Sequence, residues 1–240
     1  MGEPTYDFSG RRVVVTGGTR GLGLTVAHTF ADAGAHVTIT GTQYLTSFYD
    51  ADLSRFSYFQ LRLNDRDAII ETAERIKAVD ILVNAAGVRL PASEAHDREF
   101  IAHAARLGLI GPFSLATRLR YRLGESRVRG GGSVINTPIV RQWFDLTHGS
   151  TASSGEYAAL TQRIGTTWGR HGVRVNSLSS GVQVPRQTQL RVQIDRSSGP
   201  LLTRSRLQGA GTLEEVASVV MYLASSGAAS LTGQTLELTT

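Results

Sequence analysis

The sequence predicts an α/β fold: a doubly wound parallel sheet of about seven strands with helices on both faces. Short apolar runs alternate along the chain with longer stretches in which apolar residues recur every three or four positions. Some runs, such as Asp80–Asn84, are apolar through their centre, which is typical of strands covered on both faces. A glycine-rich segment, Thr16–Gly23, also separates the first strand from the first helix.

The first half of the chain contains four predicted strands. Arg11–Thr16 is the first strand because it carries three consecutive valines, and Gly21–Ala33 follows as a helix with one apolar face. Gly34 ends that helix because glycine tolerates the left-handed backbone found there. The other elements of this half are the strands His36–Thr40, Tyr58–Leu63 and Asp80–Asn84, the helix Asp65–Ala78, and a loop or weak helix at Tyr44–Ser57.

The second half continues the alternation without an internal repeat or a linker. The segment Ser93–Glu125 contains one or two helices, and Gly130–Gly132 then breaks the pattern. Gln183–Gly211 is a long insertion rich in Arg and Gln with no clear period. The remaining elements are the strands Ser133–Thr137, Val173–Leu178 and Gln234–Leu238 and the helices Gly155–His171 and Leu213–Ser225. We therefore expect a single domain over residues 1–240.

The glycine-rich segment is suited to binding a phosphate or pyrophosphate. Gly17, Gly21 and Gly23 allow a tight turn and a close approach of the backbone to a ligand. The helix that begins there directs free N–H groups and its positive dipole end toward the turn. The alternative is a glycine turn without a ligand, because a lone glycine loop is weak evidence.

Composition excludes several other classes of function. The chain has no cysteine, which removes disulfides and thiolate catalysis, and no histidine pattern typical of metal ligands. No apolar run approaches the roughly 20 residues of a membrane helix. The net charge is +5, but the arginines are scattered among acids, so we expect no nucleic-acid partner. These features predict a cytoplasmic, metal-free protein that is not bound to membranes. Lys77 is the only lysine.

Five segments, in this order, resemble the short-chain dehydrogenase/reductase family over nearly the whole chain. They are Thr16–Gly23, Asn84–Gly87, Gly169–Asn176, Gly211–Ala217 and Leu231–Thr235. The resemblance implies a Rossmann-type fold, a nicotinamide cofactor and a small-molecule substrate. It also implies a homodimer or homotetramer built through the helices near 105–125 and 155–171. Leu160, Ile164 and Trp168 share one face of the second helix.

The residues favour NADP(H) over NAD(H). An acidic side chain at the end of the second strand would bind the ribose hydroxyls of NAD, but Thr40–Gln43 contains none. Arg20, inside the glycine loop, could pair with a 2′-phosphate. Arg62 stands where the family usually has an Asp facing the adenine. The expected cofactor contacts are Gly17, Thr19, Arg20, Gly21, Leu22, Gly23, Thr42, Leu63, Asn84, Ala85, Ala86, Gly87, Gly181 and Val182.

The family's catalytic set is largely replaced. The resemblance implies an Asn, a Ser, a Tyr and a Lys, and Tyr157 aligns with the tyrosine. The lysine position is Thr161, the serine position is Pro138 or Ile139, and the asparagine position is Gly108. Without a neighbouring ammonium to lower its pKa, Tyr157 is expected to act as an acid and to be a poor base.

Nearby side chains offer replacements for the missing groups, and the insertion offers a lid. The candidate replacements are Thr137, Arg141, His148, Ser153, Ser154 and Arg163. The insertion at about 183–211 corresponds to the family's substrate lid, and its arginines are either an anion clamp or a solvated surface. Three hypotheses follow: a divergent NADPH-dependent ketoreductase, a non-redox enzyme (dehydratase, cyclase or lyase) with a structural cofactor or none, and a non-catalytic NADP-binding subunit.

Overall fold

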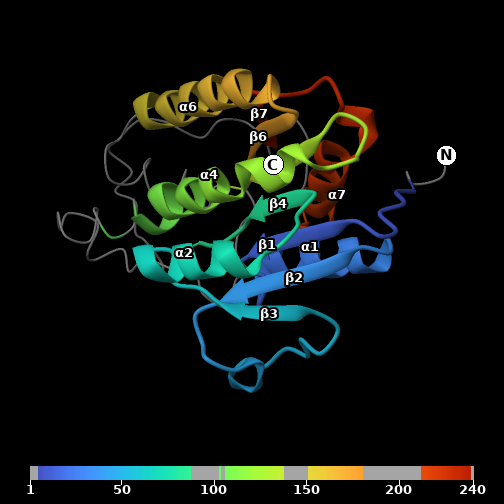
Figure 1. Cartoon of the computed structure of the whole chain (residues 1–240), viewed down its shortest axis with the longest axis vertical. Coiled ribbons are helices and arrows are strands. Elements are labelled where there is room, and N and C mark those ends of the chain that lie inside the picture. Colours follow the sequence, from blue (N-terminus) through green and yellow to red (C-terminus); the bar gives the residue numbers. More distant parts are fainter. Residues whose placement is uncertain (1–4, 88–102, 104–105, 138–150, 181–211, 239–240) are drawn as a thin grey trace, which may run out of the picture.

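The computed structural model describes residues 5–87, 103, 106–137, 151–180 and 212–238. The described strands form one seven-stranded sheet in the order β3-β2-β1-β4-β5-β6-β7, and every neighbouring pair is parallel (Figure 1). The predicted doubly wound parallel sheet is therefore confirmed. The strands are β1 (Arg12–Thr16), β2 (His36–Gly41), β3 (Ser57–Gln60), β4 (Ile81–Asn84), β5 (Gly132–Asn136), β6 (Val173–Ser180) and β7 (Thr235–Leu238).

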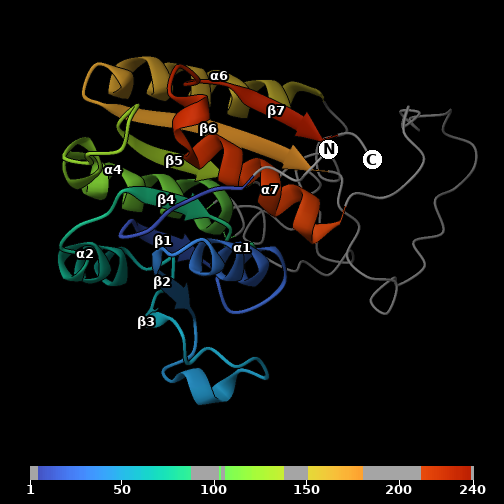
Figure 2. The same cartoon turned by 90° about the vertical axis from the view of Figure 1, so that its right-hand side faces the viewer.

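Helices cover both faces of the sheet (Figure 2). On one face lie α1 (Gly21–Asp32) and α7 (Leu213–Ala224), which contact each other. On the other face lie α2 (Arg66–Arg75), α4 (Gly111–Gly124) and α6 (Thr151–Gly169) (Figure 1). Two short 3₁₀ segments, Thr46–Phe48 and Ser226–Ala228, and a π-helical turn, Arg106–Ile110, complete the described elements.

Successive residues of a strand face opposite sides of the sheet, so the central strands divide their side chains between two cores. Val13 and Val15 of β1 pack with α1 and α7, whereas Val14 packs with α2 and α4. Leu82 of β4 is likewise fully buried in the second core. This two-sided burial explains why the strands are apolar runs and not an alternation of polar and apolar residues.

Several element boundaries differ from those predicted. The third strand, predicted over 58–63, ends at Gln60, because the chain turns and buries Leu61 and Leu63 beneath α2 and α4. The helix predicted over 65–78 spans Arg66–Arg75. It starts one residue later because Asp65 is its N-cap and accepts hydrogen bonds from the N–H groups of Asp67 and Ala68, and it ends earlier because Ile76 has an extended backbone. Helix α6 begins at Thr151, one turn before the predicted start.

Parts of the predicted organisation fall outside the described residues. They include most of the segment before Arg106 within 93–125 and the insertion Gln183–Gly211 with its proposed lid. Within the described part of the chain, no helix combines the length and apolarity needed to span a bilayer, and no group of acidic or histidine side chains could hold a metal ion.

Candidate cofactor-binding and active site

The candidate site lies where the strand order reverses. From β1 the sheet continues to β2 and β3 on one side and to β4 and β5 on the other. In such sheets the crevice outside the carboxyl ends of the strands at this point is the usual ligand site. Thr16 at the end of β1 stands in register with Asn84 at the end of β4, so the two sequence motifs meet at this crevice.

Backbone contacts join the glycine loop to the Asn84–Gly87 segment. The Ala85 N–H donates to the Thr16 carbonyl oxygen at 3.2 Å, and the Ala86 N–H donates to Thr16 Oγ1 at 3.3 Å. Gly17 has a φ of 68°, and a Cβ there would lie only 2.6 Å from the Ala86 Cα. The glycine at this position is therefore required both by its left-handed backbone and by the close approach of the second segment.

The N-terminus of α1 is open toward the loop. Its N-cap, Arg20, has an extended backbone, makes no side-chain capping bond, and is exposed; no acidic residue stands in the first turn. A Cβ on Gly21 would meet nothing within 4 Å, whereas one on Gly23 would lie 2.3 Å from the Gly17 carbonyl oxygen. The free N–H groups of a first helical turn attract an anion. The loop thus fits a pyrophosphate, which residues 17–23 would hold through their backbone.

A tyrosine side chain lies against the end of β2, where an acidic residue would bind the ribose hydroxyls of NAD. Gly41 is the last residue of β2, and a Cβ added there would lie 2.3 Å from the Tyr49 hydroxyl and 2.7 Å from Thr19 Cγ2. The Gln43 N–H donates to the Tyr49 hydroxyl at 2.9 Å. The absence of a side chain at Gly41 therefore makes room for a phenol from the β2–β3 connection, next to the glycine loop.

Tyr49 is paired with Tyr58, and their pKa values move in opposite directions. The two hydroxyls are 3.3 Å apart, and Tyr58 also donates to the Gln43 carbonyl oxygen. Burial acts to raise the pKa of Tyr49, but its hydrogen bonds with Tyr58 and with the Gln43 N–H outweigh burial and lower it. Burial and the bond to Tyr49 raise the pKa of Tyr58. Either hydroxyl can be the donor in the contact between the two tyrosines.

Buried amides line the ends of β4 and β5. Asn84 Nδ2 donates to Asn136 Oδ1 at 2.8 Å, and Thr137 Oγ1 donates to the Asn84 carbonyl oxygen at 3.1 Å. Asn84 Oδ1 and Asn136 Nδ2 have no hydrogen-bond partner among the described residues. A buried polar atom without a partner is costly, so the ends of β4 and β5 hold polar atoms whose hydrogen-bonding capacity is not satisfied by the described residues. Thr137, a candidate replacement for a catalytic group, is also buried there.

The predicted catalytic region centres on α6. Tyr157 lies on this helix, but its side chain is outside the described part of the structure. Thr161, one turn further on, is fully buried, and its hydroxyl lies 2.8 Å from Ser177 Oγ on β6. Gly108, at the asparagine position, lies in the π-helical turn, a local form frequent at functional sites. Arg163 is exposed, as its place on another helix face implies.

The remaining predicted residues divide between described and undescribed parts. Thr42 is exposed at the carboxyl end of β2, and Gln60 Nε2 donates to its carbonyl oxygen at 3.0 Å. Leu63 is buried, with its side chain in the second core. Lys77 lies just before β4, at the amino edge of the sheet and away from the carboxyl ends of the strands. Gly181, Val182, Pro138, Ile139, Arg141 and His148 lie outside the described residues, as do the side chains of Ser153 and Ser154.

Sequence reasoning missed the two tyrosines near the glycine loop. The sequence pattern places Tyr49 in a loop or weak helix and Tyr58 at the start of a strand, and assigns neither a role in the site. The available signal was Gly41, because a glycine at the end of a buried strand leaves space that another side chain must fill.

Comparisons with known proteins agree with this geometry. A family model described as enoyl-(acyl carrier protein) reductase matches residues 17–238. The chain is 27% identical to gluconate 5-dehydrogenase of Gluconobacter oxydans (strain 621H), covering 96% of this chain and 94% of that protein. A crystal structure ascribed to a betaketoacyl-ACP reductase is 30% identical with a TM-score of 0.77, covering 97% of both chains.

A second solved structure, of a short chain dehydrogenase/reductase family protein, is also 30% identical with a TM-score of 0.75, and 97% of each chain is covered. Membership of this family of oxidoreductases implies a nicotinamide cofactor, for which the glycine loop and the Asn84–Gly87 segment are suitably placed. The matched family model, the shared fold and the joined motifs lead to one conclusion: the chain belongs to the short-chain dehydrogenase/reductase family.

Proposed function

We propose that this protein is a divergent NADPH-dependent ketoreductase acting on a ketone of a small organic molecule, such as a polyketide-like or other secondary metabolite. The observation that carries the proposal is the glycine loop, held against the Asn84–Gly87 segment with the N-terminus of α1 left uncapped. This arrangement can bind the pyrophosphate of a dinucleotide through backbone N–H groups.

The choice of NADPH is supported by the end of β2. Thr42 and Gln43 are both exposed and uncharged, and the nearest described side chain at Gly41 is the phenol of Tyr49. Arg20 is the exposed cation of the loop, and a guanidinium matches a phosphate in shape and charge. We propose that Arg20 and Thr42 bind the 2′-phosphate.

In the proposed reaction the bound nicotinamide supplies the hydride, and Tyr157 supplies the proton to the carbonyl oxygen. Because Thr161 replaces the lysine, no ammonium on that turn of α6 can favour the phenolate. Residues 183–211 are proposed to cover the substrate, as part of a single domain over 1–240.

One observation favours a second candidate, a non-redox enzyme on the same scaffold. Thr161 is fully buried and bonded to Ser177, so this position serves packing between α6 and β6. This turn of the helix therefore lacks the lysine that lowers the pKa of the catalytic tyrosine in the family. A dehydratase, cyclase or lyase that uses Tyr157 with His148 or an arginine would not need that group.

The test is NADPH oxidation with a panel of ketones. For the wild type we expect measurable turnover, and for Tyr157→Phe a loss of roughly 10²–10⁴-fold, the usual contribution of general acid catalysis. Thr161→Lys should shift the pH profile of the reverse oxidation to lower pH, because an ammonium favours the phenolate. Thr161→Met is the matched control, since it adds a similar chain length without charge at the same buried position.

The outcomes separate the hypotheses. Turnover that is unaffected by Tyr157→Phe would show that the catalytic centre is placed wrongly. NADPH binding without oxidation in the wild type and in folded Thr161→Lys would reject the ketoreductase and leave the non-redox enzyme or the non-catalytic subunit.

A further inference from the structure

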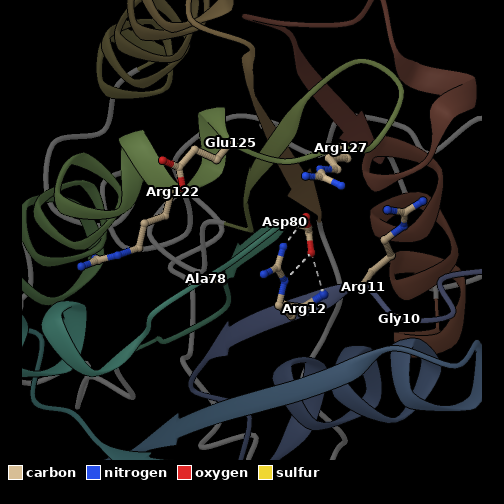
Figure 3. A pocket seen from close by; sticks show the side chains of 8 residues that line it. All are labelled: Gly10, Arg11, Arg12, Ala78, Asp80, Arg122, Glu125 and Arg127. Atoms are coloured by element: carbon tan, nitrogen blue, oxygen red, sulfur yellow. Dashed lines mark hydrogen bonds and ion pairs between the residues drawn. The ribbon is translucent and has the colours of Figure 1, made fainter.

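A polar cavity lies at the edge of the sheet opposite the candidate cofactor site. It has a volume of about 550 Å³ and is lined by residues at or just before the starts of β1 and β4, by the end of α4 and by the connection from α4 to β5 (Figure 3). In a parallel sheet the amino ends of the strands share one edge, so this cavity is separated from the carboxyl-edge crevice by the length of the strands. Four arginines line it: Arg11, Arg12, Arg122 and Arg127.

The one buried carboxylate of the cavity is already neutralised. Asp80 Oδ2 accepts from Arg12 Nε at 3.0 Å and from the Arg12 N–H at 2.9 Å. Asp80 Oδ1 accepts from Arg12 Nη2 at 3.3 Å and from Ser126 Oγ at 2.7 Å. The two carboxylate oxygens of Asp80 thus accept four hydrogen bonds, which hold the Arg12 guanidinium in place. Because the charge of Arg12 balances that of Asp80, the centre of the cavity has no net negative charge.

Two other guanidinium groups remain uncompensated. Arg11 and Arg127 form no ion pair among the described residues, and their guanidinium groups lie on the same side of Asp80 (Figure 3). Glu125 turns its carboxylate away from both (Figure 3). The pKa of the exposed Asp7 carboxylate is lowered mainly by its hydrogen bonds to Ser9, and the charge of Arg11 makes only a minor contribution.

The fourth arginine, Arg122, is hydrogen-bonded outside the cationic side of the cavity. Arg122 Nη1 donates to the Ala73 carbonyl oxygen at the end of α2 at 2.8 Å, and its side chain extends away from Arg11 and Arg127 (Figure 3). The cavity therefore has a cationic side formed by Arg11 and Arg127, next to the fixed Arg12–Asp80 pair. Like charges brought together without a counterion repel each other, so an anion bound between them would be stabilised.

From this arrangement we infer a second binding site, for a phosphate group, between Arg11 and Arg127. Guanidinium groups bind phosphate oxygens with charge-assisted hydrogen bonds, and two of them can approach one phosphate from different elements. The cavity is larger than a phosphate ion, so it can also take the organic part of a small phosphomonoester. The site does not depend on the proposed reductase activity, because none of its residues belongs to the crevice.

Titration calorimetry at low ionic strength tests the inference, with inorganic phosphate as the probe and glycerol phosphate as the ester. We expect saturable binding of one phosphate at this site. The double substitution Arg11→Gln with Arg127→Gln should lower the phosphate affinity by roughly tenfold or more for each lost charge, because a hydrogen bond to a charged group contributes about that much to binding. Tighter binding of the ester would identify a phosphomonoester as the ligand, and equal binding would identify free phosphate.

Two further variants locate the binding. Arg118→Gln removes an exposed charge from α4 away from the cavity and should leave phosphate affinity unchanged. Arg20→Gln removes the cation of the glycine loop. If this variant still binds phosphate, the new site is distinct from the cofactor site, even if the reductase proposal fails. Phosphate binding that is absent, or that survives the double substitution in a variant with unchanged thermal unfolding, would overturn the inference.

Discussion

Arg20 is the residue on which the proposed cofactor preference depends. It is exposed, lies at the N-cap of α1, and its side chain makes no capping bond, so its guanidinium is available to a ligand. On the other side of the loop, Thr19 is buried against Gly41 and Tyr49. The loop thus presents one cation and no carboxylate at the end of β2.

We predict that Arg20→Ala narrows the difference in affinity between NADPH and NADH. Removal of charge-assisted bonds to the 2′-phosphate should raise the Kd for NADPH by roughly 10- to 100-fold. The Kd for NADH, which lacks this phosphate, should change little. Calorimetric titration of both cofactors measures the effect, with Arg118→Ala as the control. Equal affinities in the wild type, unaltered in the variant, would remove Arg20 from the cofactor site.

At the scale of elements, Asp80 ties together the amino ends of β1 and β4 and the connection before β5. It bonds Arg12 at the start of β1 and Ser126 in that connection, while its own side chain is only 3% exposed. Burial acts to raise the pKa of Asp80, but the hydrogen bonds from Arg12 outweigh burial and hold the pKa below its ordinary value.

Asp80→Asn should therefore destabilise the protein in a pH-dependent way. Because the folded pKa lies below the unfolded one, the carboxylate stabilises the fold above about pH 4, and this stabilisation is lost as pH falls through the folded pKa. At pH 7 we expect the free energy of unfolding to fall by about 3 kcal/mol, the lower end for a broken buried pair, since Arg12 is partly exposed. The difference from wild type should shrink in acid.

Denaturant unfolding at several pH values gives this comparison. Asp32→Asn is the matched control, because Asp32 pairs with Arg55 at 2.8 Å on the surface, with both side chains well exposed. An exposed pair contributes at most about 1 kcal/mol. An Asp80→Asn effect no larger than the control, or one that grows in acid, would contradict the buried-pair interpretation.

At the scale of the whole molecule, the predicted oligomer depends on the outer surface of α4 and α6. The face of α6 used to predict it is partly internal: Trp168 is 6% exposed, and Ile164 packs against the same core. The apolar spacing of these residues therefore serves the fold itself. On α4, by contrast, Tyr121 is 74% exposed, with the Arg120 guanidinium 4.6 Å from its ring centre.

We predict a homodimer or homotetramer in which α4 contributes this exposed face. Burial of an aromatic anchor at an interface is a common source of binding energy, so Tyr121→Glu should shift the protein toward monomer. Light scattering at micromolar concentration measures the mass. Tyr44→Glu is the control, because Tyr44 is equally exposed (76%) on the β2–β3 connection. A monomeric wild type would rule out the prediction.

The sequence by itself determined the elements, their order and the glycine loop. These are local properties: the apolar runs, the helical period, and glycines such as Gly17, which the structure shows with a left-handed backbone. The local pattern also located α1 and α7 to within one residue of their observed bounds. The catalytic identity of Tyr157 stays a prediction, because it came from alignment with a family pattern and not from contacts.

Only the tertiary structure decided which distant residues share an environment. Tyr49 lies against Gly41 and Thr19, Asp80 accepts hydrogen bonds from Arg12 and Ser126, and Arg11 and Arg127, 116 positions apart in the chain, line one cavity. Such meetings depend on the register of parallel strands that are joined by long crossovers, and no local period encodes that register. The same reason explains why Trp168, which looked like an interface residue on its helix, belongs to the core.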